Sequence, residues 1–199
     1  MATVNARAPG RPRSEAARRD IMAAATELVI AQGYAATTME GIARRAGVSK
    51  QTIYRWWSSP ADIVLEALTE GALQRSPLVE TGDFSHDLRV FVRRSVIGAR
   101  GHVARLLTAL MAHAQYDSSF AERFRTEFLA GRRTVLYSLM DHARTRGDLR
   151  PGVTDAQLRF LSEVFFGTLW YRLLAASGPV NTRLADDLAD ILLTQVSRT

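Results

Sequence analysis

The 199-residue sequence contains no cysteine, and only one of its 26 basic residues is a lysine. Without cysteine the chain has no disulfide, no thiolate zinc site and no thiol-based redox sensor. No apolar run approaches the roughly 20 residues that a transmembrane helix needs. The apolar stretch from Met22 to Ile30 is interrupted by Glu27 and lacks a convincing signal-peptide cleavage site. We therefore expect a cytoplasmic protein with no membrane partner.

Motifs for catalysis and metal binding are also missing from the sequence. It has no glycine-rich phosphate loop, no HExxH or GxSxG motif and no alternating strand pattern. Four histidines lie in separate segments without metal-ligand spacing, which favours surface or core roles: His86, His102, His113 and His142. We expect no catalytic site, no metal and no cofactor.

Charge is concentrated at one end of the chain, whose formal net charge is +6. Residues 1–60 hold nine Lys and Arg against four Asp and Glu, whereas residues 61–199 hold 17 against 16. A basic segment joined to a near-neutral body is typical of a nucleic-acid-binding module attached to another domain.

The segment from Thr37 to Trp57, TTMEGIARRAGVSKQTIYRWW, has the pattern of two short helices joined by a tight turn. Gly47 suits the left-handed position that ends the first helix, and Ser49 suits the N-cap of the second. Val48 is predicted to fill the turn. The predicted inner faces consist of Ile42, Ala43, Ala46, Ile53 and Trp56. This pattern predicts a helix-turn-helix.

Polar and basic side chains occupy the remaining positions of this segment. Such groups contact phosphates and base edges in DNA. We predict that Lys50 and Tyr54 meet phosphate, and that Gln51, Thr52 and Arg55 lie nearer base edges. The full set of predicted DNA contacts in the segment is Thr37, Thr38, Ser49, Lys50, Gln51, Thr52, Tyr54 and Arg55.

The flanking segments extend the pattern. A helix is predicted over residues 14–32, and Ser58-Ser59-Pro60 begins another. The stretch GYAATTMEGIARRAGVSKQTIYRWWSSPADIVLEAL, residues 33–68, resembles the TetR family of bacterial transcriptional regulators, and the resemblance is specific over about residues 14–73. Pro60 departs from the family, which often has a phosphate-contacting lysine there, so that contact is not expected.

Residues 1–13 are predicted to form a disordered basic arm. The tetrapeptide Gly10-Arg11-Pro12-Arg13 resembles an AT-hook, an extended segment that lies in a narrow minor groove. On this interpretation Arg11 and Arg13 contact DNA. The alternative is a solvated tail.

Residues 61–199 show helical periodicity throughout, with helices predicted over 83–101, 103–116, 119–146, 154–177 and 183–196. The predicted fold is therefore all-α. It consists of a three-helix DNA-binding domain over residues 14–60 and a helical effector-binding and dimerisation domain over residues 61–199.

The helix predicted over residues 154–177 is apolar on nearly every face, so it must be covered on all sides. A second copy of the chain is the favoured cover, although burial within one chain is the alternative. The family resemblance implies an interface of four helices, the last two of each subunit. Candidate interface residues are Leu161, Phe165, Leu169, Leu188 and Leu192.

The resemblance also implies an effector pocket among the middle helices of the body. The residues could equally be plain core, but the candidates are Phe91, Leu107, Met111, His113, Tyr116, Phe124, Phe128 and Trp170. Because the sequence offers little buried charge there, we expect a small apolar effector.

Together these observations predict a ligand-responsive regulator, a repressor that binds a palindromic double-stranded DNA operator as a homodimer and is released by a small apolar molecule. One alternative is an architectural or constitutive DNA-binding protein without an effector, for which no compound alters DNA affinity. A more distant alternative is a helical enzyme, which would bring titratable residues together inside the body.

Overall fold

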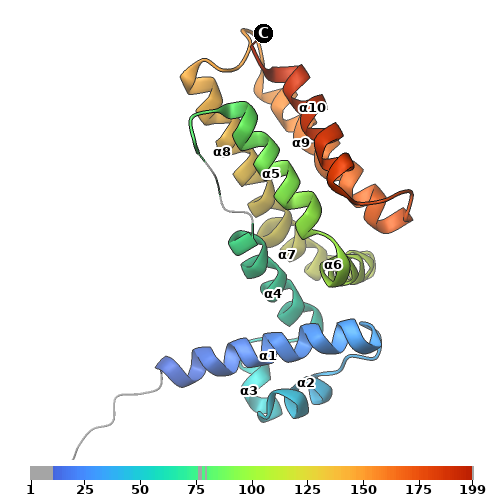
Figure 1. Cartoon of the computed structure of the whole chain (residues 1–199). Coiled ribbons are helices and arrows are strands. Elements are labelled where there is room, and N and C mark those ends of the chain that lie inside the picture. Colours follow the sequence, from blue (N-terminus) through green and yellow to red (C-terminus); the bar gives the residue numbers. More distant parts are fainter. Residues whose placement is uncertain (1–10, 76–77, 79, 199) are drawn as a thin grey trace, which may run out of the picture. The chain divides into compact units, whose positions relative to one another are not determined.

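A computed structural model describes residues 11–75, 78 and 80–198 of the chain. It divides into two compact units, Met1–Ala67 and Leu68–Thr199. The division falls later than the predicted boundary after residue 60, because Ala61, Ile63 and Val64 are buried in the first unit. The all-α prediction is confirmed (Figure 1), and no strand occurs among the described residues. None of the helices in this part of the chain is long and apolar enough to cross a membrane.

The N-terminal unit is built from α1 (Arg11–Gln32), α2 (Met39–Ala46), α3 (Lys50–Tyr54) and the first half of α4 (Pro60–Arg75). In Figure 1, α1 lies alongside α2 and α3, and α2 contacts both neighbours. The residues at the centre of this unit have no exposed surface: Ile21, Ala25, Ile42, Ile53 and Ile63.

The start of α1 differs from the prediction. The helix begins at Arg11, so residues 11–13 are helical instead of belonging to an extended arm. Residues 1–10 lie outside the described part of the chain. The side chains of Arg11 and Arg13 are also outside the described part of the structure, so their contacts with DNA stay predictions.

Local capping signals position α2 and α3. Gly47 ends α2 with φ 67°, a left-handed conformation that glycine adopts without a Cβ penalty. The Ser49 side chain caps α3 by accepting a hydrogen bond from the Thr52 backbone N–H at 3.2 Å. Thr38, and not Thr37, caps α2, with Oγ1 accepting from the Gly41 N–H at 3.1 Å.

The inner aromatic after α3 is Trp57, which is buried, whereas Trp56 is half-buried. The prediction that Trp56 faces inward was wrong because Trp57 takes the position one turn after the buried Ile53, with its backbone N–H donating to the Ile53 carbonyl at 3.0 Å. The two indole rings meet edge to face with centroids 5.5 Å apart.

The C-terminal unit contains a further set of helices: α5 (Phe84–Gly98), α6 (Gly101–His113), α7 (Ser118–Arg123), the π-helix η1 (Phe124–Leu129), α8 (Ala130–Arg146), α9 (Asp155–Ala175) and α10 (Thr182–Val196). Helix α5 packs against α10 and α8, and α9 packs against α8, α10 and α6 (Figure 1). Fully buried side chains at its centre are Leu88, Leu110, Phe120, Leu136, Met140 and Phe165. The predicted helix over 119–146 exists, but the π-helix η1 interrupts its regular α-helical geometry.

Helix α9 is apolar all round, as predicted, but its faces are used differently. All five residues predicted for the dimer interface are buried within the single chain, so they have almost no surface to offer a second copy: Leu161, Phe165, Leu169, Leu188 and Leu192. The large apolar side chains that α9 and α10 leave exposed are Phe160, Tyr171, Leu174 and Ile191. The predicted interface residues are therefore core residues.

Candidate DNA-binding surface and ligand pocket

The outer surface of α2, the turn and α3 presents polar side chains to solvent. Six of the residues predicted to contact DNA are exposed there: Thr38, Ser49, Lys50, Gln51, Tyr54 and Arg55. Thr52 is half-buried, and its hydroxyl lies 2.9 Å from the Ser49 hydroxyl. Thr37 is buried, and its hydroxyl donates to the Gly33 carbonyl at 2.9 Å, so it has no free surface for DNA. The prediction for Thr37 was wrong because the chain turns inward just before the Thr38 cap.

Lys50 forms an ion pair with Glu40 across the turn, from Nζ to Oε1. The hydrogen bond from Lys50 is the main reason why the pKa of Glu40 lies below its ordinary value. Both side chains are more than half exposed, so water screens the pair and it adds little to stability. The pair nevertheless places a carboxylate beside the ammonium that was predicted to meet phosphate.

Two further basic groups flank α3. The Arg55 guanidinium lies over the Trp56 ring, 4.8 Å from its centroid, which fixes its direction through a cation–π contact. Arg45 on α2 pairs with Glu27 on α1, with 2.5 Å between Nη2 and Oε2.

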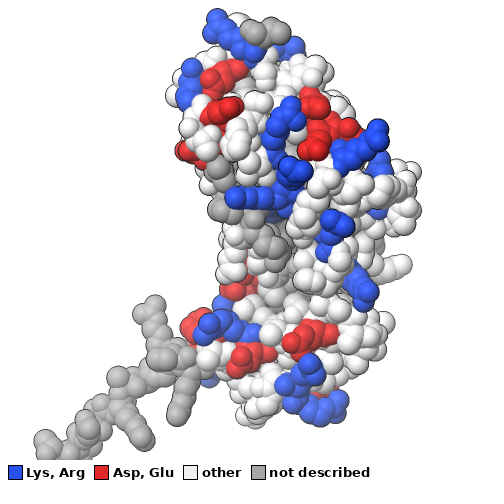
Figure 2. Space-filling view, viewed as in Figure 1, with Lys and Arg blue, Asp and Glu red and all other residues white. Residues whose placement is uncertain are grey.

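Basic side chains gather over α2, with acidic ones close by (Figure 2). Arg44 and Arg45 are both exposed near the C-terminal end of this helix. Neither was predicted from the sequence to contact DNA, because the exposed side of a first helix is normally only a solvated face. The available signal for a basic surface was the pair of adjacent arginines in the last turn of α2.

The C-terminal unit contains a pocket whose unoccupied space, counted to its open mouth, is about 570 Å³. Residues from α4, α5, α6, η1, α8 and α9 line it: Leu68, Ala72, Arg94, Ser95, Gly98, Ala99, Val103, Leu107, Phe128, Leu129, Arg132, Phe166, Leu169, Trp170 and Leu173. Most of this lining is apolar, and the space that it encloses, about 60 Å³, is much smaller than the volume counted to the open mouth.

Three of the eight predicted pocket residues line this space: Leu107, Phe128 and Trp170. Phe91 and Phe124 lie behind the lining, where Phe91 packs on Phe165 and Phe124 on Phe128. Met111 is half-buried but outside the lining.

The other two candidates, His113 and Tyr116, are also absent from the lining. The His113 ring packs on Phe120 with centroids 4.8 Å apart, and Tyr116 is 92% exposed. Tyr116 follows the end of α6 at His113, so helical spacing does not turn it inward.

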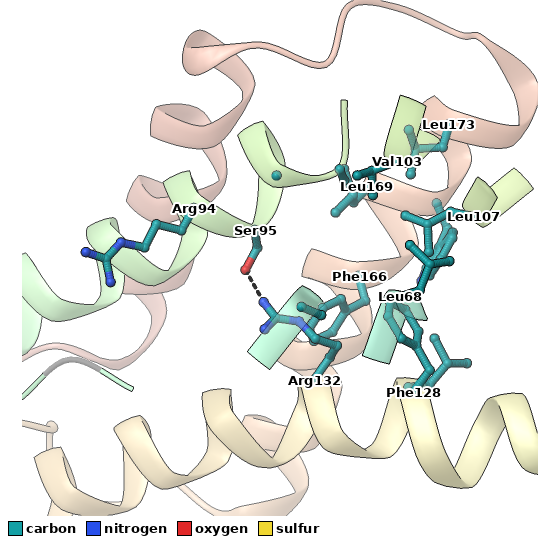
Figure 3. Close-up of a pocket in the computed structure, with 15 residues that line it drawn as sticks. Leu68, Arg94, Ser95, Val103, Leu107, Phe128, Arg132, Phe166, Leu169 and Leu173 are labelled. Carbon is teal, nitrogen blue, oxygen red and sulfur yellow. Dashed lines mark hydrogen bonds between the residues drawn. The ribbon is translucent and has the colours of Figure 1, made fainter. Parts of the chain in front are cut away.

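A buried arginine that was not predicted from the sequence lines the pocket. Arg132 is 8% exposed, and its Nη2 donates to the Ser95 hydroxyl at 2.6 Å. Its guanidinium also lies 5.3 Å from the centroid of the Phe91 ring. Figure 3 shows its side chain reaching from α8 toward Ser95, whereas Arg94 extends away from the apolar cluster. The signal that could have revealed it is its position four residues after Phe128 and four before Leu136, both buried.

Both units match known protein families. Residues 21–67 match the family described as bacterial regulatory proteins, tetR family, and residues 78–192 match the tetracyclin repressor-like C-terminal domain. The chain belongs to the TetR family. TetR-family proteins of this kind are DNA-binding transcriptional regulators, so the helix-turn-helix of the N-terminal unit is a DNA-binding element.

Relatives of known sequence cover nearly the whole chain. An uncharacterised HTH-type transcriptional regulator of Bacillus subtilis, YdeS, is 31% identical over 179 residues, which are 90% of this chain and 89% of the relative. The DNA-binding transcriptional repressor TetR of Mycobacteroides abscessus is 26% identical over 94% of this chain and 98% of its own. The crystal structure of the TetR family transcription regulator SCO0332 superposes with a TM-score of 0.75 at 31% identity, covering 92% of this chain and 99% of that one.

Proposed function

We propose that this TetR-family regulator is a repressor that binds a palindromic operator as a homodimer and leaves it when a small organic molecule fills the pocket of the C-terminal unit. The observation that carries the proposal is the apolar pocket itself, which a purely architectural DNA-binding protein does not need. Similarity to a relative named as a repressor supports repression over activation.

On the DNA side, α3 is the proposed recognition helix. Gln51 on this helix and Arg55 at its C-cap are exposed and are the proposed contacts to base edges, and the exposed Lys50 and Tyr54 are the proposed contacts to phosphate. One short helix reads few base pairs. Two copies related by a two-fold axis read a palindrome, which is the reason to expect a dimer.

The proposed dimer face is the exposed side of α9. Its apolar or small residues recur at alternating steps of four and three, the spacing of a helix–helix seam: Phe160, Val164, Gly167, Tyr171 and Leu174. A Cβ at Gly167 would meet no atom within 4 Å in the single chain, so a second helix has room to approach there. Ile191 of α10, 48% exposed, adds a further apolar side chain.

Helix α4 contributes residues to both units, which gives a physical basis for a switch. In the N-terminal unit its Glu66 binds the Trp57 indole N–H and pairs with Arg18. Its second half provides Leu68 and Ala72 to the pocket lining. A ligand that prefers one position of these two residues would shift the population of α4 conformers, and operator affinity would change with it.

Operator mapping followed by ligand release tests this proposal. The full chain is incubated with DNA fragments flanking its own gene, the protected site is mapped, and compounds are tested for release of the protein from that site. We expect a palindromic footprint and release by compounds that also raise the melting temperature. Compounds that stabilise the protein yet never change DNA affinity would favour the architectural alternative.

A further inference from the structure

We infer that the C-terminal pocket takes an amphipathic carboxylic acid, with an apolar body against the hydrophobic lining and a carboxylate that accepts hydrogen bonds at the Arg132 end. This inference depends on the proposed function, because it names the chemical class of the effector for the same pocket. It adds a charged group to the small apolar effector that the sequence predicts.

The first argument is the charge of the lining. Among the described residues that line the pocket, Arg94 and Arg132 are the charged ones, and no Asp or Glu is present. Arg94 is exposed and extends away from the apolar cluster (Figure 3), whereas Arg132 is buried at its edge. A buried guanidinium in an apolar lining favours a negatively charged ligand group, since their attraction is stronger where water is excluded.

The second argument is that the Arg132 guanidinium has a fixed orientation. The Ser95 hydroxyl, 2.6 Å from Nη2, and the Phe91 ring, 5.3 Å from the guanidinium carbon, hold the Arg132 head group in one orientation. A donor held in this way loses little conformational entropy when it binds a ligand. The Ser95 hydroxyl lines the same space and is a second polar group beside the expected carboxylate.

The third argument concerns the charge of the ligand. A single guanidinium suits a ligand group with one negative charge, such as a carboxylate. A phosphate monoester carries about two negative charges and three strong acceptor oxygens, so it needs more donors. The remaining lining is hydrocarbon and aromatic, including Phe128, Phe166 and Trp170, which suits an alkyl or aryl body of the acid.

The test compares acids with uncharged molecules of the same shape. Octanoate, 4-phenylbutyrate and 1-naphthoate, each beside its primary amide, are titrated into the full chain by calorimetry. We expect at least one acid to bind about tenfold or more tightly than its amide, as expected for a hydrogen bond to a charged group. Equal binding of acid and amide, tighter binding of octyl phosphate than of octanoate, or no acid binding at millimolar concentration would each overturn the inference.

Two matched variants assign the preference to one side chain. Arg132→Met removes the buried charge at similar volume and should abolish the preference for acid over amide while leaving amide affinity within about threefold. Arg93→Met makes the same change at an exposed arginine of α5 that does not line the pocket, and it should retain the preference. If Arg132→Met does not fold, Arg132→Lys keeps a positive charge and should still favour the acid over the amide. An unchanged preference in Arg132→Met would refute the assignment.

Operator release, measured with the same compounds, separates the two proposals. Acid preference in binding without any release would contradict the proposed switch and leave the ligand class standing. Release by amides and acids at equal concentrations would support the switch and overturn the carboxylate assignment.

Discussion

Phe160 and Phe165 on α9 provide a matched test of which side of this helix meets a second copy. Phe160 is 63% exposed, whereas Phe165 has no exposed surface and packs on Phe91 and Phe166 with ring centroids 6.0 and 4.7 Å away. The two positions are five residues apart on one helix. The same substitution, Phe→Ala, should therefore affect dimerisation at one position and folding at the other.

The magnitudes follow from the buried area. A phenylalanine side chain of roughly 200 Å² that is 63% exposed has about 125 Å² left to bury in a dimer, worth about 3 kcal/mol. Alanine retains part of that contact, so we expect a loss of about 2 kcal/mol per protomer and 4 kcal/mol per dimer. Phe160→Ala should thus weaken the dimer about a thousandfold.

Phe165→Ala should instead cost about 3–5 kcal/mol of folding free energy and lower Tm by roughly 6–20 °C. Its folded fraction should dimerise like the wild type, because Phe165 has no surface to offer. Sedimentation equilibrium from nanomolar to micromolar concentration measures the dimer, and thermal unfolding measures the fold. A wild type that is monomeric at micromolar concentration, or a Phe160→Ala dimer as tight as the wild type, would refute the assignment of this face.

The remaining predictions concern the N-terminal unit. Lys50→Ala should reduce the salt dependence of DNA binding by about one ion per subunit, and an unchanged slope in salt titrations would remove its phosphate role. Glu40→Gln should tighten binding to random DNA, because it removes a carboxylate beside Lys50. The lowered pKa of Glu40 means that its pair with Lys50 is intact at neutral pH and is lost as pH falls; Lys50→Ala should raise that pKa in an NMR titration. Glu66→Gln should destabilise this unit by about 1–3 kcal/mol, detected through Trp57 fluorescence, since it weakens the contacts to Trp57 and Arg18.

The sequence predicted best those features that depend on a few neighbouring residues. Gly47 has the left-handed conformation expected of it, and Ser49 caps α3. Thr154 caps α9 through a capping box with Gln157. Capping residues can be predicted from the sequence because their hydrogen bonds span only three or four residues.

Features that depend on packing partners could not be predicted in the same way. Helix α9 is apolar on nearly all sides, so its pattern does not say which side meets α8 and which remains exposed. Leu161 and Phe160 are adjacent and equally hydrophobic, yet one is buried and the other is 63% exposed. Only the positions of the neighbouring helices decide between them.

The π-helix η1 explains why a charged residue reached the pocket. A row at strict four-residue spacing is buried from one end of α7–η1–α8 to the other: Phe120, Phe124, Phe128, Arg132, Leu136 and Met140. In a regular α-helix each step of four residues overshoots a full turn by about 40°, so five steps would carry the row about 200° around the helix. The wider i→i+5 turns over Phe124–Leu129 take up part of that drift and keep Arg132 on the inner side. The same segment contributes Phe128 and Leu129 to the lining. The irregular turn therefore both shapes the pocket wall and brings the buried guanidinium to it.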